Sequence, residues 1–238
     1  MRRSAAWFAF LALTATTAFC QATPPVELLN TLNEPAPLSG HPFLKTNQWI
    51  ATQFITDDRH YLLDHFVFNT RGRSEVTDIV GSVLASDGPG GVPGTLLSPL
   101  VVPAMPFSGV AAESPPYVPE TEVMLEPNTA YWVFLGRVDG GGTNPVWLRS
   151  EEELFSPFAP FPGELEREVP GVGTIGPRPA VSRNRGATWN ILSTVYPQQL
   201  KVVATVIPEP SAGALALLFA SIVGLRLRKW GVYLAPVQ

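Results

Sequence analysis

The fold class follows from one stretch of the sequence, Leu125-Glu126-Pro127-Asn128-Thr129-Ala130-Tyr131-Trp132-Val133-Phe134-Leu135. Its first half predicts a tight turn, because Pro127 fixes its own φ and Asn128 tolerates the left-handed region. Its second half is an unbroken run of aromatic and β-branched residues, which predicts a strand buried on both faces. A turn that leads directly into a buried strand is typical of a packed β-sheet protein.

Similar short runs, bounded by turn formers, recur on both sides of this stretch. The predicted strands are Ile50–Thr56, Tyr61–Asn69, Asp78–Ala85, Glu122–Leu125, Thr129–Val138, Val146–Arg149, Thr188–Leu192 and Gln199–Val206. No helical stripe of useful length lies between residues 40 and 207, and the 25 Pro and 20 Gly suit turns and strand ends. We therefore predict an all-β fold, an antiparallel β-sandwich or jelly-roll-like domain.

Simple alternation along Tyr61–Asn69 predicts which side chains share a face. Leu62, Phe66 and Phe68 are expected on one face. Tyr61, Leu63 and Val67 are expected on the other. Because both faces are apolar, this segment is predicted to be a central strand of the sandwich.

The predicted domain spans residues 48–206, after a signal peptide at 1–22 and a leader or linker at 23–47. The leader is rich in Pro, Asn and Leu and poor in β-branched residues, which predicts a poorly ordered arm. Residues 140–181 depart from the simple pattern, and residues 151–185 hold dense Pro and Gly clusters with few β-branched positions. They predict a long loop that either wraps over the sheet or extends from it.

The charge limits the classes of partner, and the cysteine content limits the kinds of site, that the chain can have. The whole chain carries a formal charge of −4, but residues 23–207 carry 11 basic and 19 acidic side chains, a charge of −8. A body this acidic argues against nucleic acid or an anionic membrane surface as partner. The one cysteine, Cys20, lies in the signal segment, so the mature body is predicted to have no disulfide, zinc knuckle or thiol nucleophile.

The N-terminus has the three parts of a secretory signal peptide. Arg2 and Arg3 precede an uncharged apolar run from Ala5 to Phe19, and Cys20-Gln21-Ala22 predicts cleavage after Ala22. We expect a signal helix that the Sec translocon recognises. The alternatives are a membrane anchor, for which the apolar run is short, and a lipoprotein at Cys20, for which Phe19 is too bulky.

The C-terminus carries a second set of export features. Pro208-Glu209-Pro210 precedes an uncharged run from Ala212 to Leu225, and the basic residues Arg226, Arg228 and Lys229 follow. The run predicts a short transmembrane helix, and the positive-inside rule keeps the basic cluster in the cytoplasm as a membrane stop. An ordinary tail anchor is the alternative.

These three parts, in this order, resemble the PEP-CTERM sorting signal over residues 207–230, with a short tail at 231–238. The resemblance implies an exosortase as processing partner, acting near Pro208-Glu209-Pro210. It also implies a Gram-negative bacterium that makes extracellular polysaccharide. The expected route is export, an inner-membrane intermediate, and then the cell surface or extracellular space.

The body resembles the choice-of-anchor R domain in several segments. They are Ile50–Phe54, Tyr61–Phe66, Gly81–Gly94, Leu125–Val133 and Gly186–Trp189. The resemblance covers about residues 48–206 and implies a β-sandwich of unassigned biochemical role on a bacterial surface protein. Such modules carry different C-terminal anchors, PEP-CTERM among them.

Two acidic clusters could supply the carboxyl groups of a glycosidase, which needs two of them at a fixed separation. Glu151-Glu152-Glu153 and Asp57-Asp58 are the densest clusters, and both fall in predicted loops. Like charges side by side usually face water, so solvated acidic loops are the favoured interpretation. A secreted hydrolase remains the third functional alternative.

Metal sites are weakly indicated. Asp57, Asp58, Asp87 and Asp139 lie near turns and could bind Ca²⁺, although no Asp-x-Asp-x-Asp-Gly loop occurs. The histidines are His41, His60 and His65. On one strand residues 60 and 65 face opposite sides, and His60 with Asp64 would supply only two ligands. We expect no catalytic residue, no bound metal and no cofactor, with Ca²⁺ as the open alternative.

Four tryptophans lie in or beside predicted strands: Trp49, Trp132, Trp147 and Trp189. Core packing is the favoured interpretation, because aromatic residues dominate sandwich cores. Carbohydrate-binding sandwiches, however, stack sugars on exposed rings. Trp147, beside Arg149 and the long loop, is the ring predicted to be exposed for ligand stacking.

The sequence therefore predicts a non-enzymatic surface or matrix protein, exported and processed by an exosortase, with a structural or adhesive role linked to extracellular polysaccharide. The alternative is a carbohydrate-binding module on the same fold, which needs an exposed aromatic platform or a Ca²⁺ site.

Overall fold

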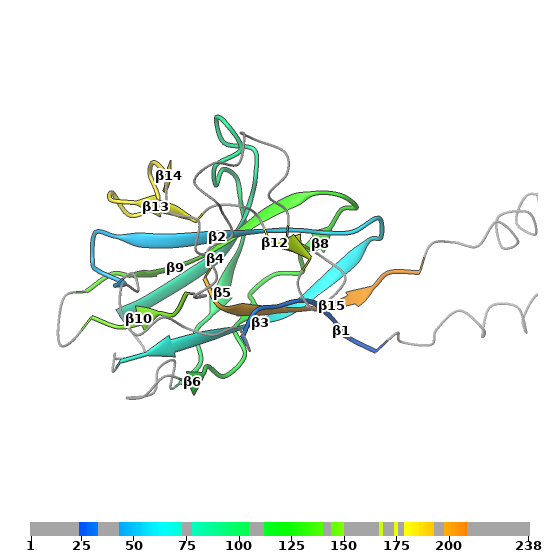
Figure 1. The fold of residues 1–238 in the computed structure, drawn as a ribbon, viewed down its shortest axis with the longest axis horizontal. Coiled ribbons are helices and arrows are strands. Elements are labelled where there is room, and N and C mark those ends of the chain that lie inside the picture. Colours follow the sequence, from blue (N-terminus) through cyan, green and yellow to red (C-terminus); the bar gives the residue numbers. More distant parts are fainter. Residues whose placement is uncertain are drawn as a thin grey trace, which may run out of the picture. The chain divides into compact units, whose positions relative to one another are not determined.

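The computed structural model describes residues 24–32, 43–72, 78–104, 112–139, 144–149, 167–168, 174–175, 179–192 and 198–208. These residues form strands and turns and include no helix, and the strands make two antiparallel sheets (Figure 1). The chain divides into two compact units, Met1–Val206 and Ile207–Gln238, and every described strand belongs to the first. The all-β prediction is confirmed for the described residues.

The first sheet is built around β3. Its strand order is β1 (Val26–Asn30), β15 (Leu200–Val206), β3 (Tyr61–Arg71) and β10 (Val146–Trp147). Two short strands, β6 (Ala112–Glu113) and β8 (Met124–Leu125), also pair with β3. The N-terminal and C-terminal strands of the domain are therefore neighbours in this sheet.

The second sheet has β9 at its centre. Its order is β11 (Arg167–Glu168), β12 (Thr174–Ile175), β2 (Trp49–Ile55), β9 (Ala130–Arg137), β4 (Ile79–Ala85), β5 (Leu96–Val101) and β7 (Val118–Pro119). Beside it, β13 (Ala180–Ser182) pairs with both β2 and β14 (Asn190–Ile191). The buried strand predicted from Tyr131 to Leu135 is β9, which pairs with β2 on one side and β4 on the other.

The long predicted strands agree with β2, β3, β4, β9 and β15 to within about two residues at either end. Three predicted strands are shorter in the structure: β8, β10 and β14 have two residues each. The sequence prediction missed β5, because Pro99 lies inside it and proline usually argues against a strand. Pro99 lies opposite Ser82 of β4, near the edge of the sheet.

The predicted leader is wrong in one respect, because residues 26–30 are part of the folded domain. They form β1, which pairs antiparallel with β15, and Leu28 and Leu29 are fully buried. The Oγ1 of Thr31 accepts a hydrogen bond from the backbone N–H of Leu200 at 2.9 Å. Burial of two leucines outweighs the low β-propensity that made this segment look unstructured.

The faces predicted for Tyr61–Asn69 are confirmed for Phe66, Phe68 and Val67 but are wrong for the residues before Asp64. His65 lies opposite Val203 and Leu63 lies opposite Ala204, so Asp64 is an extra residue in the ladder. This β-bulge breaks the alternation, and Tyr61 and Leu63 join Phe66 and Phe68 in the core. A period of two cannot reveal a bulge, since the inserted residue looks like any other in the sequence.

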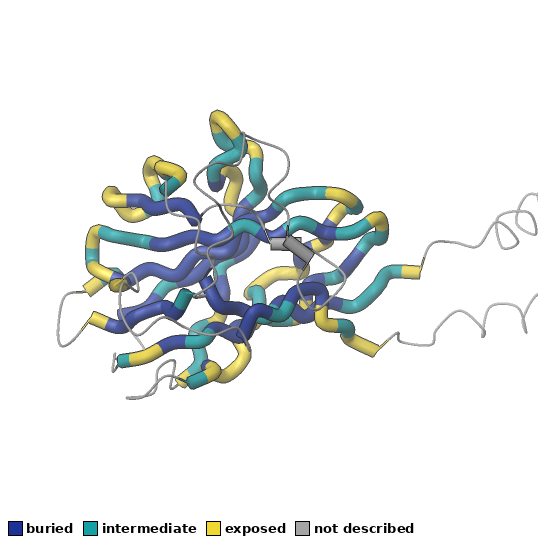
Figure 2. Tube along the Cα trace, in the orientation of Figure 1, coloured by how far each residue is buried: buried dark blue, intermediate teal, exposed yellow. Residues whose placement is uncertain are grey.

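The two sheets share one hydrophobic core. It contains residues of the first sheet such as Leu29 and Phe66 and residues of the second such as Phe54 and Val133. Figure 2 shows the buried residues along the middle of the strands and the exposed residues at the turns. Within the core, Phe68 makes edge contacts with Tyr117 and Trp147, at 4.9 and 5.1 Å between ring centroids.

Residues 112–125 connect the sheets along one side of the core. The segment pairs with β3 at β6, forms a two-way backbone bridge between Tyr117 and Phe66, and then pairs with β5 at β7. It returns to β3 at β8. This connection brings the fully buried Tyr117 ring against the aromatic residues of β3.

The predicted turn before β9 is confirmed. Asn128 has a φ of 48°, in the left-handed region. Its neighbour Thr129 donates its backbone N–H to the Oγ1 of Thr56, and that hydroxyl donates to the carbonyl of Glu126 at 2.6 Å. The backbone N–H of Glu126 donates to the hydroxyl of Tyr131 at 2.7 Å, which ties the turn to the strand that follows.

Candidate functional site

The outer face of the second sheet is apolar, although nothing in the described part of the chain forms a third layer over all of it. Because side chains alternate along β2, β4 and β9, one set enters the shared core and the other faces outward. The outward set forms a separate buried cluster of Ala51, Leu84, Trp132, Phe134 and Ala180, with Trp49, Val80 and Trp189 packed against it.

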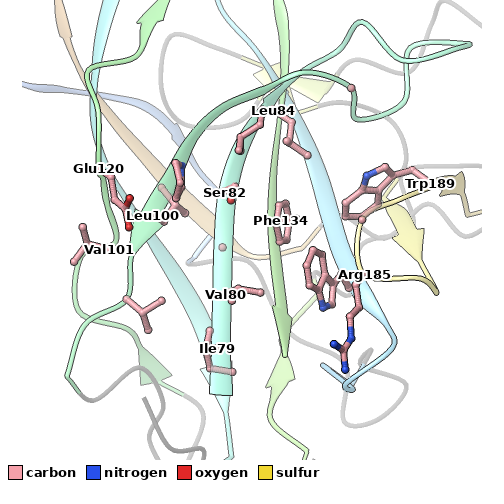
Figure 3. Close-up of a pocket in the computed structure, with 17 residues that line it drawn as sticks. Ile79, Val80, Ser82, Leu84, Leu100, Val101, Glu120, Phe134, Arg185 and Trp189 are labelled. Carbon is pink, nitrogen blue, oxygen red and sulfur yellow. The ribbon is translucent and has the colours of Figure 1, made fainter. Parts of the chain in front are cut away.

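This face is hollowed into an open groove of about 700 Å³. Figure 3 shows Val80 and Ser82 of β4 along its floor. Phe134 and Trp189 line one side, while Leu100 and Val101 line the other. The volume falls within the range of small-molecule sites, and the lining is mostly apolar with a few polar groups.

Three aromatic rings form the wall of the groove. Trp49 and Phe134 stack in parallel, with 4.9 Å between ring centroids and an interplanar angle of 8°. Trp189 lies tilted against Phe134 at 5.6 Å and 52°. Both tryptophans are half-buried, so each ring keeps part of its surface open to solvent.

Two glycines make room for Trp49. A Cβ at Gly136 would overlap the indole ring, and a Cβ at Gly186 would lie 2.9 Å from its Cζ3. Gly186 also has a φ of +85°, which favours glycine on conformational grounds. The indole N–H of Trp49 donates to the carbonyl of Arg137 at 3.2 Å, so the ring is fixed at both its apolar and polar ends.

The loop that presents Trp189 is held by its own side chains. The hydroxyl of Ser182 accepts the backbone N–H of Gly186 at 2.8 Å. The side chain of Asn184 accepts the backbone N–H of Thr188 and donates to the Thr188 hydroxyl, both at 2.9 Å. These bonds fix the loop between β13 and β14 before any ligand arrives.

Two charged side chains stand at the margins of the groove, Arg185 and Glu120. Arg185 is exposed, adopts a φ of 56° and donates to the carbonyl of Val138 at 3.3 Å. With one cation and one anion among its lining residues, the groove has no strong field of either sign.

The turn between β4 and β5 closes the sheet face beyond the groove. The indole N–H of Trp132 donates to the Ser86 hydroxyl at 3.1 Å and to the Gly91 carbonyl at 3.0 Å. Ser86 also accepts from the side chain of Gln53. Trp132 is therefore an outward-facing ring that the turn covers almost completely.

The prediction that Trp147 is exposed for ligand stacking is wrong. Its side chain is fully buried, packs edge-on against Phe68, and donates its indole N–H to the Gln199 carbonyl at 2.8 Å. It pairs through β10 with the end of β3 and belongs to the shared core. The neighbouring Arg149 gave a misleading signal of a surface position.

Trp49 and Trp189, for which core packing was the favoured interpretation, line the groove in the structure. A signal for Trp49 was present, because Ile50 and Phe54 alternate with Trp49 and therefore face the opposite side of β2. The signal for Trp189 was weaker, since its position depends on the hydrogen bonds of the loop and not on strand alternation.

The Asp57-Asp58 pair offers no open carboxylate pair in the structure. Asp57 accepts hydrogen bonds from the guanidinium and the backbone N–H of Arg59 and from the hydroxyl of Tyr61. Burial pushes the pKa of Asp57 upward, but the bonds from Arg59 and Tyr61 outweigh it and hold this pKa below its ordinary value. This carboxyl group is a structural bridge between a turn and the start of β3.

The other candidate Ca²⁺ ligands are either hydrogen-bonded to protein groups or not grouped with further ligands in the described residues. Asp87 accepts the backbone N–H and the hydroxyl of Thr95, both at 2.6 Å, and these bonds lower its pKa. Asp139 is exposed. Among the residues that the structure describes, no group of three or more His, Cys, Asp or Glu side chains could hold a metal ion.

Each described histidine contacts a carboxylate on its own. His65 lies 2.8 Å from Asp64, its neighbour in the β-bulge, and His60 lies 3.2 Å from Glu126. The structure therefore separates His60 from Asp64, which the sequence had allowed as a pair. His41 lies outside the described residues.

Several predicted features fall outside the described residues. They are Ala22, Glu151–Glu153, Glu209, Pro210, Arg226, Arg228 and Lys229. Pro208 is described and exposed, two residues beyond β15. Within the described ranges no helix has the length and apolar content needed to cross a membrane, and residues 212–225 are not among them.

Compared with models of known protein families and with curated proteins, the sequence matches none of them.

Proposed function

We propose that this chain is an exported, exosortase-processed protein of the cell surface or extracellular matrix. Its two-sheet domain is a jelly-roll-like β-sandwich with a structural or adhesive role linked to extracellular polysaccharide, and it performs no catalysis. The observation that carries the proposal is the order of features after β15: Pro208-Glu209-Pro210, an uncharged apolar run, and the basic cluster Arg226, Arg228 and Lys229.

The strand order supports this proposal. β1 and β15 are antiparallel neighbours, with Val26 opposite Ala204. Figure 1 shows the start of β1 and the end of β15 at the same end of the domain. The signal-cleavage site lies four residues before Val26 and the sorting motif begins two residues after Val206. The two ends of the described domain that border the proposed processing segments are therefore neighbours in one sheet.

The C-terminal proposal is tested by fractionation with mass mapping of both chain termini, in cells with and without the exosortase. We expect an N-terminus at Thr23 in both strains, and a C-terminus near residue 210 only where the exosortase is present. Replacement of Pro208-Glu209-Pro210 by three alanines should leave the tail uncut. Pro236→Ala, in the short tail, is the matched control and should be processed normally.

The same C-terminus in both strains would contradict exosortase processing, and an uncut N-terminus in the cytosol would contradict export. Either result is read directly from the intact masses and needs no assumption about the ligand of the domain.

A second candidate, a carbohydrate-binding module, is favoured by the groove on the second sheet, with its half-buried Trp49 and Trp189. From the sequence, this function was expected to use an exposed ring at Trp147. Trp147 is buried in the structure, and the partly buried rings beside the groove are those of Trp49 and Trp189. This candidate function would make carbohydrate the ligand of the proposed adhesive role.

A further inference from the structure

We propose that the groove on the outer face of the second sheet binds a neutral polysaccharide chain, with sugar rings stacked on Trp49 and Trp189. The inference deepens the proposed function, because it names the ligand class of the surface module. It rests on that proposal for the presence of glycan outside the cell.

The first argument is the position of the aromatic rings. An outward sheet face in water is expected to be polar, yet the Phe134 ring there lies 4.9 Å from the Trp49 ring and 5.6 Å from the Trp189 ring, between centroids. These rings stand apart from the core shared by the two sheets, because they belong to or pack against a second, smaller cluster on the outer face. Half-buried indoles beside a groove are suited to a ligand with an apolar face and a polar edge.

The second argument is preorganisation. Gly136 and Gly186 leave space for the indole of Trp49, and its N–H is held by the Arg137 carbonyl. Ser182 and Asn184 fix the loop that carries Trp189. A platform whose rings are already held loses little conformational entropy when a ligand stacks on it.

The third argument is the shape of the groove. It is open to solvent and about 700 Å³ in volume, with short side chains at Val80 and Ser82 on its floor. The opposite wall includes Val101, half-exposed on β5. An open trough of this kind suits a segment of a longer chain that enters and leaves along the surface.

The fourth argument is charge. The groove is lined by one cation, Arg185, and one anion, Glu120, while residues 23–207 carry a formal charge of −8. A polyanion would meet repulsion from the body and only one positive partner in the groove. A neutral chain of hydroxylated rings can stack on the indoles and exchange hydrogen bonds with Ser82, Arg185 and Glu120.

The test is affinity electrophoresis of the full-length purified chain in native gels that contain one polysaccharide each. The neutral probes are β-glucan, mannan, xylan and galactan, and alginate is the anionic comparator. We expect at least one neutral polysaccharide to retard the protein. Trp189→Ala should weaken this retardation about tenfold or more, because the stacking surface is removed.

Two further variants help to distinguish a loss of glycan binding from a loss of the fold. Val101→Glu places bulk and charge in the opposite wall at a position that is 52% exposed, and it should also abolish retardation. Phe43→Ala removes an aromatic ring that is 48% exposed but does not line the groove, and it should bind as the parent does. Circular dichroism and denaturation midpoints identify any variant that has lost its fold.

Several outcomes would overturn the inference. They are no retardation by any neutral probe, retardation by alginate alone, or equal retardation of the parent and Trp189→Ala. Sedimentation that shows self-association lost in Trp189→Ala, without glycan binding, would assign the groove to a second copy of the chain. The masses of the termini, measured separately, would still decide the sorting proposal.

Discussion

The two aromatic clusters of this domain use the same residue types for different purposes. Between the sheets, Phe54, Phe66, Phe68, Tyr117 and Trp147 are fully buried and contact one another through edge and stacked geometries. On the outer face, Trp49, Phe134 and Trp189 form a smaller cluster in which the two tryptophans are only partly buried. Because the two clusters contain the same residue types, residue type alone does not decide the exposure of an aromatic ring. The structure around the ring decides whether it stays accessible to solvent.

The largest expected difference between the clusters is in stability. Trp147→Ala removes a fully buried ring and the hydrogen bond to Gln199, and should cost about 3–5 kcal/mol of unfolding free energy. Trp189→Ala, on the outer face, should cost less, about 1–2 kcal/mol, because this residue is only partly buried. Chemical denaturation measures the two losses of unfolding free energy, provided that the variants have the same m-value as the parent. Similar losses for the two variants would refute the distinction between a buried interior cluster and a partly buried outer cluster.

The clusters meet at the end of β9, where a buried ion pair provides the next test. The guanidinium of Arg137 is fully buried and lies 3.0 Å from Asp78, while the carbonyl of Arg137 accepts the Trp49 indole. Asp78→Asn leaves the guanidinium without its counter-charge and should cost about 3 kcal/mol.

The double variant Asp78→Asn with Arg137→Met separates the charge from the packing. It removes the unpaired cation, so it should recover part of the lost stability. If the double variant is less stable than the sum of the two single variants predicts, the ion pair is not the source of the effect. Denaturation midpoints at a fixed pH measure this coupling.

A smaller effect is expected on the outer face. Gly136→Ala places a methyl group where the Trp49 indole lies, and should displace that ring at a cost of about 1–3 kcal/mol. Iodide quenching of tryptophan fluorescence should rise, because Trp49 becomes more exposed. Unchanged quenching and stability would show that Trp49 is not held by close contact with β9. Phe43→Ala serves as the surface control.

The sequence was informative wherever a local pattern carries the structure. The runs that became β2, β3, β4, β9 and β15 were predicted, as was the left-handed Asn128 in the turn before β9. Those features depend on propensity, alternation and turn chemistry, which act over a few residues.

The sequence failed where pairing between distant segments decides the outcome. The bulge at Asp64 places Tyr61 and Leu63 on the same face of β3 as Phe66 and Phe68. Partnership with β15 made a strand of a leader that looked unstructured. The candidate site was misplaced for the same reason, since the burial of Trp147 depends on Phe68 and Gln199, which lie far from it in the sequence.

The smallest expected effect concerns the one interior ring with an unsatisfied polar end. The hydroxyl of Tyr117 is buried and has no hydrogen-bond partner among the described residues, and burial raises its pKa. Tyr117→Phe keeps the edge contact with Phe68 and removes only that hydroxyl. A buried, unpaired hydroxyl is costly, so the variant should be as stable as the parent or about 1 kcal/mol more stable. Denaturation midpoints measure the change, and a loss above about 1 kcal/mol would show that the hydroxyl has a partner in the folded protein. An unchanged or raised midpoint, beside the large loss in Trp147→Ala, would show that ring packing, and not the Tyr117 hydroxyl, stabilises the interior cluster.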